Sequence, residues 1–318
     1  MKTPPTFADL MFDVDTAPIQ AVLGYGGAVM RRTIPHKQAI IHRPSGRVLG
    51  VVSNSYRIVT NQEALKLARL VCARAFPGVA AAEWEPARVS APLTLGHANI
   101  DLHHRTHVLN LSGAGGDWKD PYTPFLRVTN SFNGTRALRF DFGFIRRHCE
   151  NGVIFEKDLA SLVVAHQRAA LGEFDVKVRA ISLEDKWREF AAMVSALRST
   201  AVGPDLARNL IETLLTLPPF AGCSDQRKSD RTVWAQEIDR RHHRYADELG
   251  ANAYAVFNVV TDFAARPPEI ASFQRPRPTL EKRAGLWLRL VAAAVAKSTV
   301  IDWPSHLTDL RKAIHQRN

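Results

Sequence analysis

The chain has 318 residues, enough for one large or two ordinary domains, and 46% of them are apolar, a share typical of folded rather than disordered proteins. No apolar run approaches the roughly 18 residues that a membrane-spanning helix needs, so we expect no membrane association. The net charge of +11 and the pI of about 9.9 point instead to a polyanionic partner.

Residues 1–27 show neither a helical nor an alternating pattern, and we expect an irregular lead-in there. This segment carries one Lys and three Asp, which fits neither a secretory nor a transit peptide. The three cysteines, Cys72, Cys149 and Cys223, are widely spaced and form no CxxC pair, which indicates a reducing, cytoplasmic setting.

Residues 28–155 have the pattern of a strand-rich domain. The runs Ile40–Arg43 and Val48–Ser53 flank the turn RPSGR and are predicted to pair as a hairpin. The motif Thr60-x-x-Glu63 is a capping box, which predicts a helix from there to Phe76, packed on one face of the sheet. This domain also concentrates the charge, because residues 28–150 carry 17 Lys and Arg against 8 Asp and Glu.

Further strands are expected at about 81–90, 93–105 and 106–112, followed by a hairpin centred on Asn133-Gly134. From residue 156 to 318 the apolar spacing becomes helical. The predicted helices are Glu156–Leu171, Leu183–Ser199, Pro204–Leu217, Ser229–Leu249, Ala251–Ala265, Leu280–Ser298 and Ser305–Arg317. This order predicts an α+β fold: an antiparallel, β-rich N-terminal half with one packed helix, and a helical C-terminal half packed on the sheet.

The hairpin at Asn133-Gly134 is unusually rich in arginine. A three-residue loop, 132–134, puts Gly134 in the left-handed position and makes Phe140, Phe142 and Phe144 core residues. Arg127 then lies across from Arg139 on the other face, where two like charges destabilise the strand pair. Either Asp141 and solvent offset this repulsion, or a phosphate backbone neutralises both arginines. The second alternative predicts that replacing both by Gln leaves stability unchanged or slightly higher.

The candidate nucleic-acid interface combines this hairpin with two other basic points on strands. Asn130 and Asn133 either fix the turn through local hydrogen bonds or present their amides to a ligand. The candidate residues are Arg31, Arg32, Arg127, Asn130, Ser131, Asn133, Arg136, Arg139, Arg146 and Arg147. We expect DNA rather than RNA, and single-stranded DNA first, because no helix-turn-helix or zinc-finger pattern is present.

The sequence gives little support for a metal site, a cofactor or a reactive thiol. Asp101-x-His103 supplies at most two converging metal ligands, so a polar strand face is favoured over a metal site. The glycine-rich segments match no phosphate-binding loop, and we expect no cofactor. Cys149, beside three basic residues, is favoured as a buried structural thiol over a reactive one. On the helix around 240–248, Arg244 is expected to pair with Asp247 or Glu248.

Three segments resemble one known family. RVLGVVSNSYRIVTNQEAL, RVTNSFNGTRALRF with RRHCENG, and FNVVTDFA are similar to the signature segments of domain of unknown function 932, over about Arg47 to Ala265. Thr135 stands where that family usually has Ser, and Asn133 where Asp is common. The resemblance implies a phage- or plasmid-type mobile element and no established enzymatic activity.

The leading hypothesis is a non-catalytic nucleic-acid-binding protein of such an element, in single-stranded DNA binding or annealing during recombination or replication. One alternative is a metal-dependent nuclease or hydrolase that uses Asp101 and His103 with Asp141 or Glu150. The other is a protein-binding factor that forms oligomers with itself or inhibits host defence.

Overall fold

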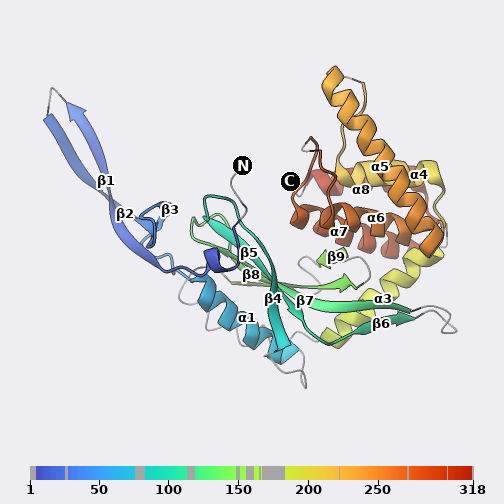
Figure 1. Cartoon of the computed structure of the whole chain (residues 1–318), viewed down its shortest axis with the longest axis horizontal. Coiled ribbons are helices and arrows are strands. Elements are labelled where there is room, and N and C mark those ends of the chain that lie inside the picture. The colour runs from blue at the N-terminus through green and yellow to red at the C-terminus, as the bar shows by residue number, and fades with distance from the viewer. Residues whose placement is uncertain are drawn as a thin grey trace. The chain divides into compact units, whose positions relative to one another are not determined.

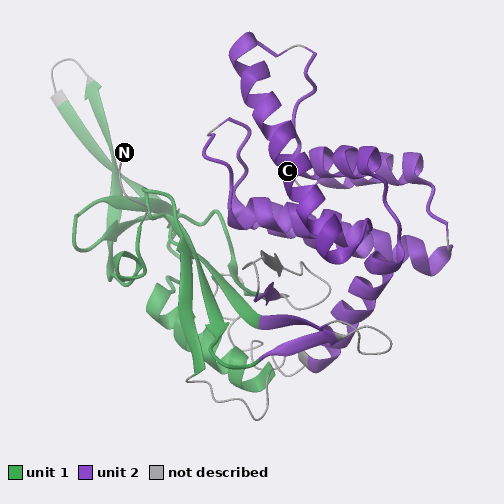
Figure 2. Ribbon diagram, turned by 45° about the vertical axis from the view of Figure 1, so that its right-hand side comes forward, with its two compact units in different colours: residues 1–107, 124–142, 157–183 green, residues 108–123, 143–156, 184–318 purple. Residues whose placement is uncertain are grey.

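The computed structural model divides the chain into two compact units, each assembled from three separate segments (Figure 2). Unit 1 comprises residues 1–107, 124–142 and 157–183, and unit 2 comprises residues 108–123, 143–156 and 184–318. The described residues are 5–25, 28–75, 83–112, 119–147, 151–154, 161–164, 166, 183–221, 223–270, 272–298 and 300–316.

Two sheets contain the described strands (Figure 1). The smaller sheet has the order β1-β2-β3, formed by Val14–Tyr25, Ala28–His42 and Val48–Ser53. The larger, seven-stranded sheet has the order β10-β8-β7-β5-β4, with β6 paired to β7 and β9 paired to β8. Its strands are β4 Trp84–Ser90, β5 His97–His104, β6 Leu109–Ser112, β7 Lys119–Ser131, β8 Leu138–Arg146, β9 Asn151–Ile154 and β10 Ser161–Val164. The registered pairs in both sheets are antiparallel, which confirms the predicted sheet type.

The helices also follow the prediction closely. A 3₁₀ turn, η1 Ala8–Leu10, precedes the strands, and the capping box starts α1, with the Thr60 amide donating to Glu63 Oε2 at 2.8 Å. The longer helices are α1 Asn61–Ala75, α3 Leu183–Ser199, α4 Pro204–Leu215, α5 Asp225–Leu249, α6 Ala253–Ala265, α7 Arg277–Lys297 and α8 Trp303–His315. The α+β class is therefore confirmed.

Two local predictions are wrong. The irregular lead-in over 1–27 contains β1, which pairs with β2 along most of its length. Pro18 and Gly24 are uncommon within strands and obscured the strand pattern. This strand forms because it pairs with β2, and not because its own apolar and polar residues alternate. The helix predicted over Glu156–Leu171 contains β10, which pairs with β8; residues 155–160, 165 and 167–171 lie outside the described part.

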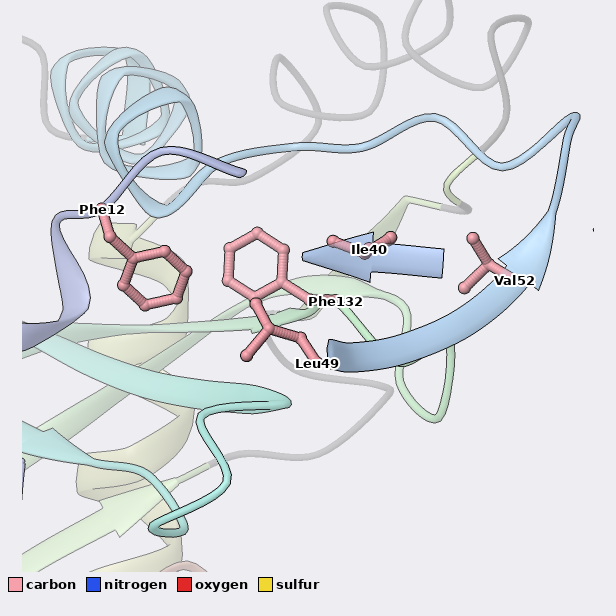
Figure 3. Packing of buried hydrophobic residues seen from close by; sticks show 5 residues of the cluster. All are labelled: Phe12, Ile40, Leu49, Val52 and Phe132. Atoms are coloured by element: carbon pink, nitrogen blue, oxygen red, sulfur yellow. The ribbon is translucent and has the colours of Figure 1, made fainter. Parts of the chain in front are cut away.

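The two signature segments of unit 1 pack against each other in its core. Phe12, Ile40, Leu49, Val52 and Phe132 form a buried apolar cluster, in which the Phe12 and Phe132 rings lie 5.3 Å apart (Figure 3). The segments LGVVSNSY and NSFNGT thus pack together in this apolar cluster, so they have a structural role.

A hydrogen bond and a close backbone approach join these segments. The Tyr56 hydroxyl donates to the Ser131 carbonyl oxygen at 2.6 Å, and burial raises the pKa of Tyr56 to about 12, so the hydroxyl remains a donor at neutral pH. A Cβ on Gly50 would lie 2.4 Å from Asn133 Cα and 3.0 Å from the Phe132 carbonyl oxygen. Only glycine fits at position 50 without displacing the neighbouring backbone.

Replacing Gly50 by Ala is expected to lower the free energy of unfolding by about 1–3 kcal/mol, because the added methyl group overpacks against backbone that cannot rotate away. The matched control is Gly24→Ala in β1, where a Cβ meets nothing within 4 Å and stability should stay within about 0.5 kcal/mol. Urea unfolding of both variants measures the difference. Equal stabilities would contradict the close packing of the two segments.

Unit 2 is organised around α6. Every residue from Ala253 to Ala264 is buried, which places this helix in the centre of the helical part rather than on its surface. The Asn252 side chain caps its start by accepting hydrogen bonds from the amides of Tyr254 and Ala255 at 3.0 and 3.1 Å. None of the helices in the described ranges is long and apolar enough to cross a membrane.

Candidate nucleic-acid interface

The most exposed secondary structure of unit 1 is a β-ribbon formed by residues 14–25 and 28–42, here called the β1–β2 ribbon (Figure 1). β3 pairs only with Lys37–Ile41 of β2, so the outer part of the ribbon is two-stranded. An isolated two-stranded ribbon has no core of its own, because both of its faces meet solvent. The outer part is therefore available to a partner on either face.

Each face of the outer ribbon combines one arginine with large apolar side chains. Arg31 pairs with Val22, and Arg32 pairs with Ala21, so the two neighbouring arginines point to opposite faces. Val29 lies two residues from Arg31 on its face, and Met30 lies two residues from Arg32 on the other, paired with Leu23. Both arginines are exposed, as are the four large apolar side chains, with exposed fractions of 50–69% for Val22, Leu23, Val29 and Met30.

The ribbon has an unusual charge. From Thr16 to His42 the sequence contains Arg31, Arg32 and Lys37 but no Asp or Glu. Asp15, the acidic residue of β1, pairs with Ile41 at the other end of the ribbon and accepts hydrogen bonds from Arg43, so it does not neutralise the two arginines. A surface that combines uncompensated guanidinium groups with exposed aliphatic side chains is typical of a binding surface.

The prediction that Arg127 lies on an exposed face of the sheet is wrong. Arg127 is buried and bonds Asp101 of β5 in a bidentate pair, with Nε and Nη2 each 2.6 Å from a carboxylate oxygen. Asp101 is the direct cross-strand partner of Arg127, and Arg88 of β4 stands opposite Asp101 on its other side. β7 is an inner strand buried on both faces from Leu126 to Ser131, so no polar face remains for a ligand there.

Two other candidate arginines are also engaged by carboxylates. Arg139 donates to Asp141 at 3.0 Å. Arg146 is buried, bonds Asp120 at 2.7 and 2.9 Å through Nε, and donates to Glu248 at 2.6 Å through Nη2. Asp141, predicted to offset the repulsion between Arg127 and Arg139, bonds Arg139, whereas Arg127 is balanced by Asp101.

The Arg146–Asp120 pair belongs to a polar network in unit 2 that also includes the buried hydroxyl groups of Tyr122 and Tyr254. The Tyr254 hydroxyl donates to Asp120 Oδ2 at 2.7 Å and is also hydrogen-bonded to the Tyr122 hydroxyl. Burial, and next the charge of Asp120, raise the pKa of Tyr254, so its hydroxyl stays protonated. The polar groups of this network bond one another, so its role is structural rather than ligand binding.

The asparagine side chains of the NSFNGT segment bond other groups of the protein. The buried Asn130 side chain donates to the Val59 carbonyl oxygen at 2.8 Å and to Asn61 Oδ1 at 2.9 Å. Asn133 Oδ1 accepts from Ser131 Oγ at 2.8 Å and from the Thr135 hydroxyl at 2.6 Å, which fixes the turn. Gly134 has φ +70°, as predicted, but six residues rather than three separate β7 from β8.

Of the candidate residues, Arg31, Arg32, Arg136 and Arg147 are exposed, and Asn133 is half-buried. Arg31 and Arg32 belong to the smaller sheet, whereas the hairpin arginines belong to the larger one, so the predicted single basic sheet face does not exist. Phe140, Phe142 and Phe144 are buried core residues as predicted and offer no stacking surface for bases.

The structure does not favour the alternative of a metal-dependent nuclease or hydrolase. Two of the carboxylates named as its ligands bond arginines instead, because Asp101 bonds Arg127 and Asp141 bonds Arg139. Within the described ranges, no three His, Cys, Asp or Glu side chains lie close enough to hold a metal ion. Glu150 and Cys149 lie outside the described residues.

The sequence interpretation missed a cluster of arginines around Asp262, where α5 and α6 meet. Arg244 was expected to pair within its own helix, but its Nη2 donates to Asp262 at 2.8 Å. The only sequence signal was the acidic residue of the FNVVTDFA segment, an isolated carboxylate in an apolar helix.

Comparison with known proteins agrees with the resemblance in the sequence. The family model described as Domain of unknown function (DUF932) matches residues 48–284. The match contains β3, the larger sheet and most of the helical part, but begins after the β1–β2 ribbon. The searches of curated proteins and of solved structures returned no match. Since the family model covers well over half of the chain, the protein belongs to the DUF932 family.

Proposed function

We propose that the protein is a non-catalytic nucleic-acid-binding protein that engages double-stranded DNA with the β1–β2 ribbon. The observation that carries this proposal is the pair of exposed arginines, Arg31 and Arg32, on opposite faces of a ribbon that has no acidic residue from Thr16 to His42. The phage- or plasmid-type setting and the cytoplasmic location stay predictions.

The shape of the ribbon favours a duplex over a single strand. The major groove of B-DNA admits a two-stranded β-ribbon, and phosphates border it on both sides. A ribbon with one guanidinium group on each face can neutralise both borders, while its aliphatic side chains contact base edges or thymine methyl groups. Single-strand binding would require stacking surfaces, and the hairpin residues Phe140, Phe142 and Phe144 are buried and do not offer them. Duplex RNA is disfavoured because its major groove is too narrow and deep.

Replacing Arg31 and Arg32 together by Gln is expected to weaken duplex binding and to reduce the slope of log affinity against log salt by about two units. Each phosphate contact on B-DNA releases roughly 0.9 counterion, so two lost contacts account for this change. Fluorescence anisotropy with a labelled duplex, across a salt series, measures it. The labelled single strand and an RNA duplex of the same sequence should bind more weakly.

The matched control is Arg188→Gln with Lys228→Gln, which removes the same charge from exposed side chains that pair with carboxylates of their own helices. Its salt slope should stay near that of the unchanged protein. Equal slopes for the two double variants would show that net charge, and not the ribbon, governs binding. No salt-dependent binding by the unchanged protein would refute nucleic-acid binding altogether.

A second candidate function is self-association, and the observation that favours it is the exposure of Val22, Leu23, Val29 and Met30. This candidate expects a concentration-dependent dimer in analytical ultracentrifugation that Leu23→Ser with Met30→Ser abolishes. The arginine variant separates the two functions, because it should leave such a dimer intact.

A further inference from the structure

The outer part of the β1–β2 ribbon has two open edges (Figure 1). It consists of residues 20–25 of β1, which are registered against residues 28–33 of β2. Within the described ranges, β1 pairs with β2 alone and β3 reaches only Lys37–Ile41 of β2, so neither outer edge has a neighbouring strand. A two-stranded hairpin of this kind is at best marginally stable in water, because it lacks both a third strand and a core.

The open edge of β1 carries main-chain groups without a partner. In an antiparallel strand, alternate residues direct their amide and carbonyl groups to opposite edges, so every second residue of β1 directs them away from β2. Among the described residues, none bonds the main chain of residues 14–25 from that side. Such an edge pairs readily with a strand of another chain unless charged side chains or prolines protect it.

Only one of the two edges has this protection. β2 carries Arg31 and Arg32 in succession, and pairing of β2 with β2 of a second copy would bring these charges together. Residues 16–24 of β1 contain no Asp, Glu, Lys or Arg, and their one proline, Pro18, lies outside the outer part of the ribbon. The edge of β1 is therefore the one that can accept a further strand.

Exposed apolar side chains accompany the open edge. Seven of the fourteen large apolar side chains exposed among the described residues belong to the smaller sheet, although its strands have only 12, 15 and 6 residues. These seven are Val22, Leu23, Val29, Met30, Ile34, Val48 and Val51. Val22 and Leu23, 63% and 50% exposed, are neighbours in β1 and point to opposite faces. A strand added beside β1 would cover part of both side chains, so apolar burial would reinforce the main-chain hydrogen bonds.

We propose that the edge of β1 pairs antiparallel with β1 of a second copy of the chain, which joins the two outer ribbons into a four-stranded sheet in the order β2-β1-β1-β2. A strand without charged residues suits pairing with itself about a two-fold axis, because no like charges meet. The β2 strands of the two copies, with their arginines, stay three strand spacings apart, roughly 14 Å. This pairing rests on the second candidate function, self-association, and not on DNA binding.

Sedimentation velocity of the full chain, without DNA and over a range of protein concentrations, tests the pairing. We expect a monomer–dimer equilibrium whose Kd is about 10-fold weaker in Val22→Glu with Leu23→Glu, because carboxylates of the two copies then meet across the paired strands. Val22 lies opposite Arg31, so one new carboxylate has a counter-charge within its own ribbon.

The matched control is Val29→Glu with Met30→Glu in β2. It adds the same charge to side chains of similar exposure, 69% and 58%, on the strand that does not meet the second copy. Its dimer Kd should stay close to that of the unchanged protein. An unchanged Kd in the β1 variant, or equal weakening in both variants, would overturn edge pairing, since packing between ribbon faces involves both strands.

Hydrogen exchange of the unchanged protein needs no variant and identifies the strand that pairs. Raising the protein concentration from below to above the dimer Kd should slow exchange of the outward amides of residues 20–24, because they gain partners, but not of the outward amides of residues 29–33. Slower exchange of the β2 amides instead would place the contact on the wrong edge and overturn the pairing.

The pairing and the proposed DNA binding fail separately. A protein that stays monomeric at all concentrations would refute edge pairing together with self-association, and duplex binding by the single ribbon could still hold. Loss of duplex binding would leave the dimer measured without DNA unaffected. Because the major groove admits a two-stranded ribbon, the four-stranded form has to separate before a ribbon enters it.

Discussion

Replacing Arg127 by Gln is expected to lower the free energy of unfolding by about 3 kcal/mol, because Asp101 loses the guanidinium group that holds both of its oxygens. Both side chains are 4% exposed, so water cannot replace the lost partner. Breaking a buried ion pair costs roughly 3–5 kcal/mol, and we expect the lower end because Arg88 stands opposite Asp101 on β4. Such a loss would contradict the alternative in which a phosphate backbone neutralises Arg127 and Arg139, which predicts unchanged or slightly higher stability when both are replaced by Gln.

Urea unfolding measures the loss, and two further variants define its origin. Adding Asp101→Asn to Arg127→Gln removes the buried charge and should recover a large part of the stability. The exposed Arg136→Gln serves as a surface control and should change stability by less than about 0.5 kcal/mol. If Arg127→Gln left stability unchanged and weakened DNA binding, Arg127 would face a ligand after all.

The second large effect is expected at Arg146. Arg146→Gln leaves Asp120, which is 2% exposed, without the guanidinium group that bonds both of its oxygens, and should cost about 3–5 kcal/mol. Tyr254 still donates to Asp120, but a hydroxyl cannot balance a buried charge. The same unfolding measurement applies.

Glu248→Gln provides the internal comparison for this network. Glu248 accepts from the same guanidinium group at 2.6 Å, but it is 45% exposed, so water can replace its contact. Its replacement should cost less than about 1 kcal/mol. Similar losses from Arg146→Gln and Glu248→Gln would mean that burial of Asp120 does not set the energy of the network.

The helical part was predictable because its signals are local. Leu183–Ser199 begins and ends where its periodic apolar residues do, and Pro204 and Gly203 mark the start of the next helix. The partner of Arg127 was not predictable in this way. Asp101 lies 26 residues away on a strand whose position beside β7 depends on the whole sheet, so no local pattern indicates that both faces are covered.

The candidate site was predictable only in part. Arg31 and Arg32 were recognised as basic, but their place on a projecting ribbon follows from pairing between β1 and β2, and β1 had no strand pattern. For Arg244, local spacing favoured carboxylates one turn away, whereas the buried Asp262 on the next helix binds it instead. Burial strengthens an ion pair by removing competing water, and sequence spacing contains no information on burial.

The division of each unit into three segments affects how the chain can fold during synthesis. Unit 1 needs residues up to 183, and unit 2 begins at residue 108 and needs the helices near the end of the chain. β7 and β8 each contribute residues to both units, so a ribosome-bound chain of about 150 residues contains incomplete parts of both. Neither unit can be released by a single proteolytic cut, and unit 2 can be completed only after the helices near the end of the chain have been synthesised. We expect a chain of this kind to expose unpaired strands during synthesis for longer than one whose domains follow each other in sequence.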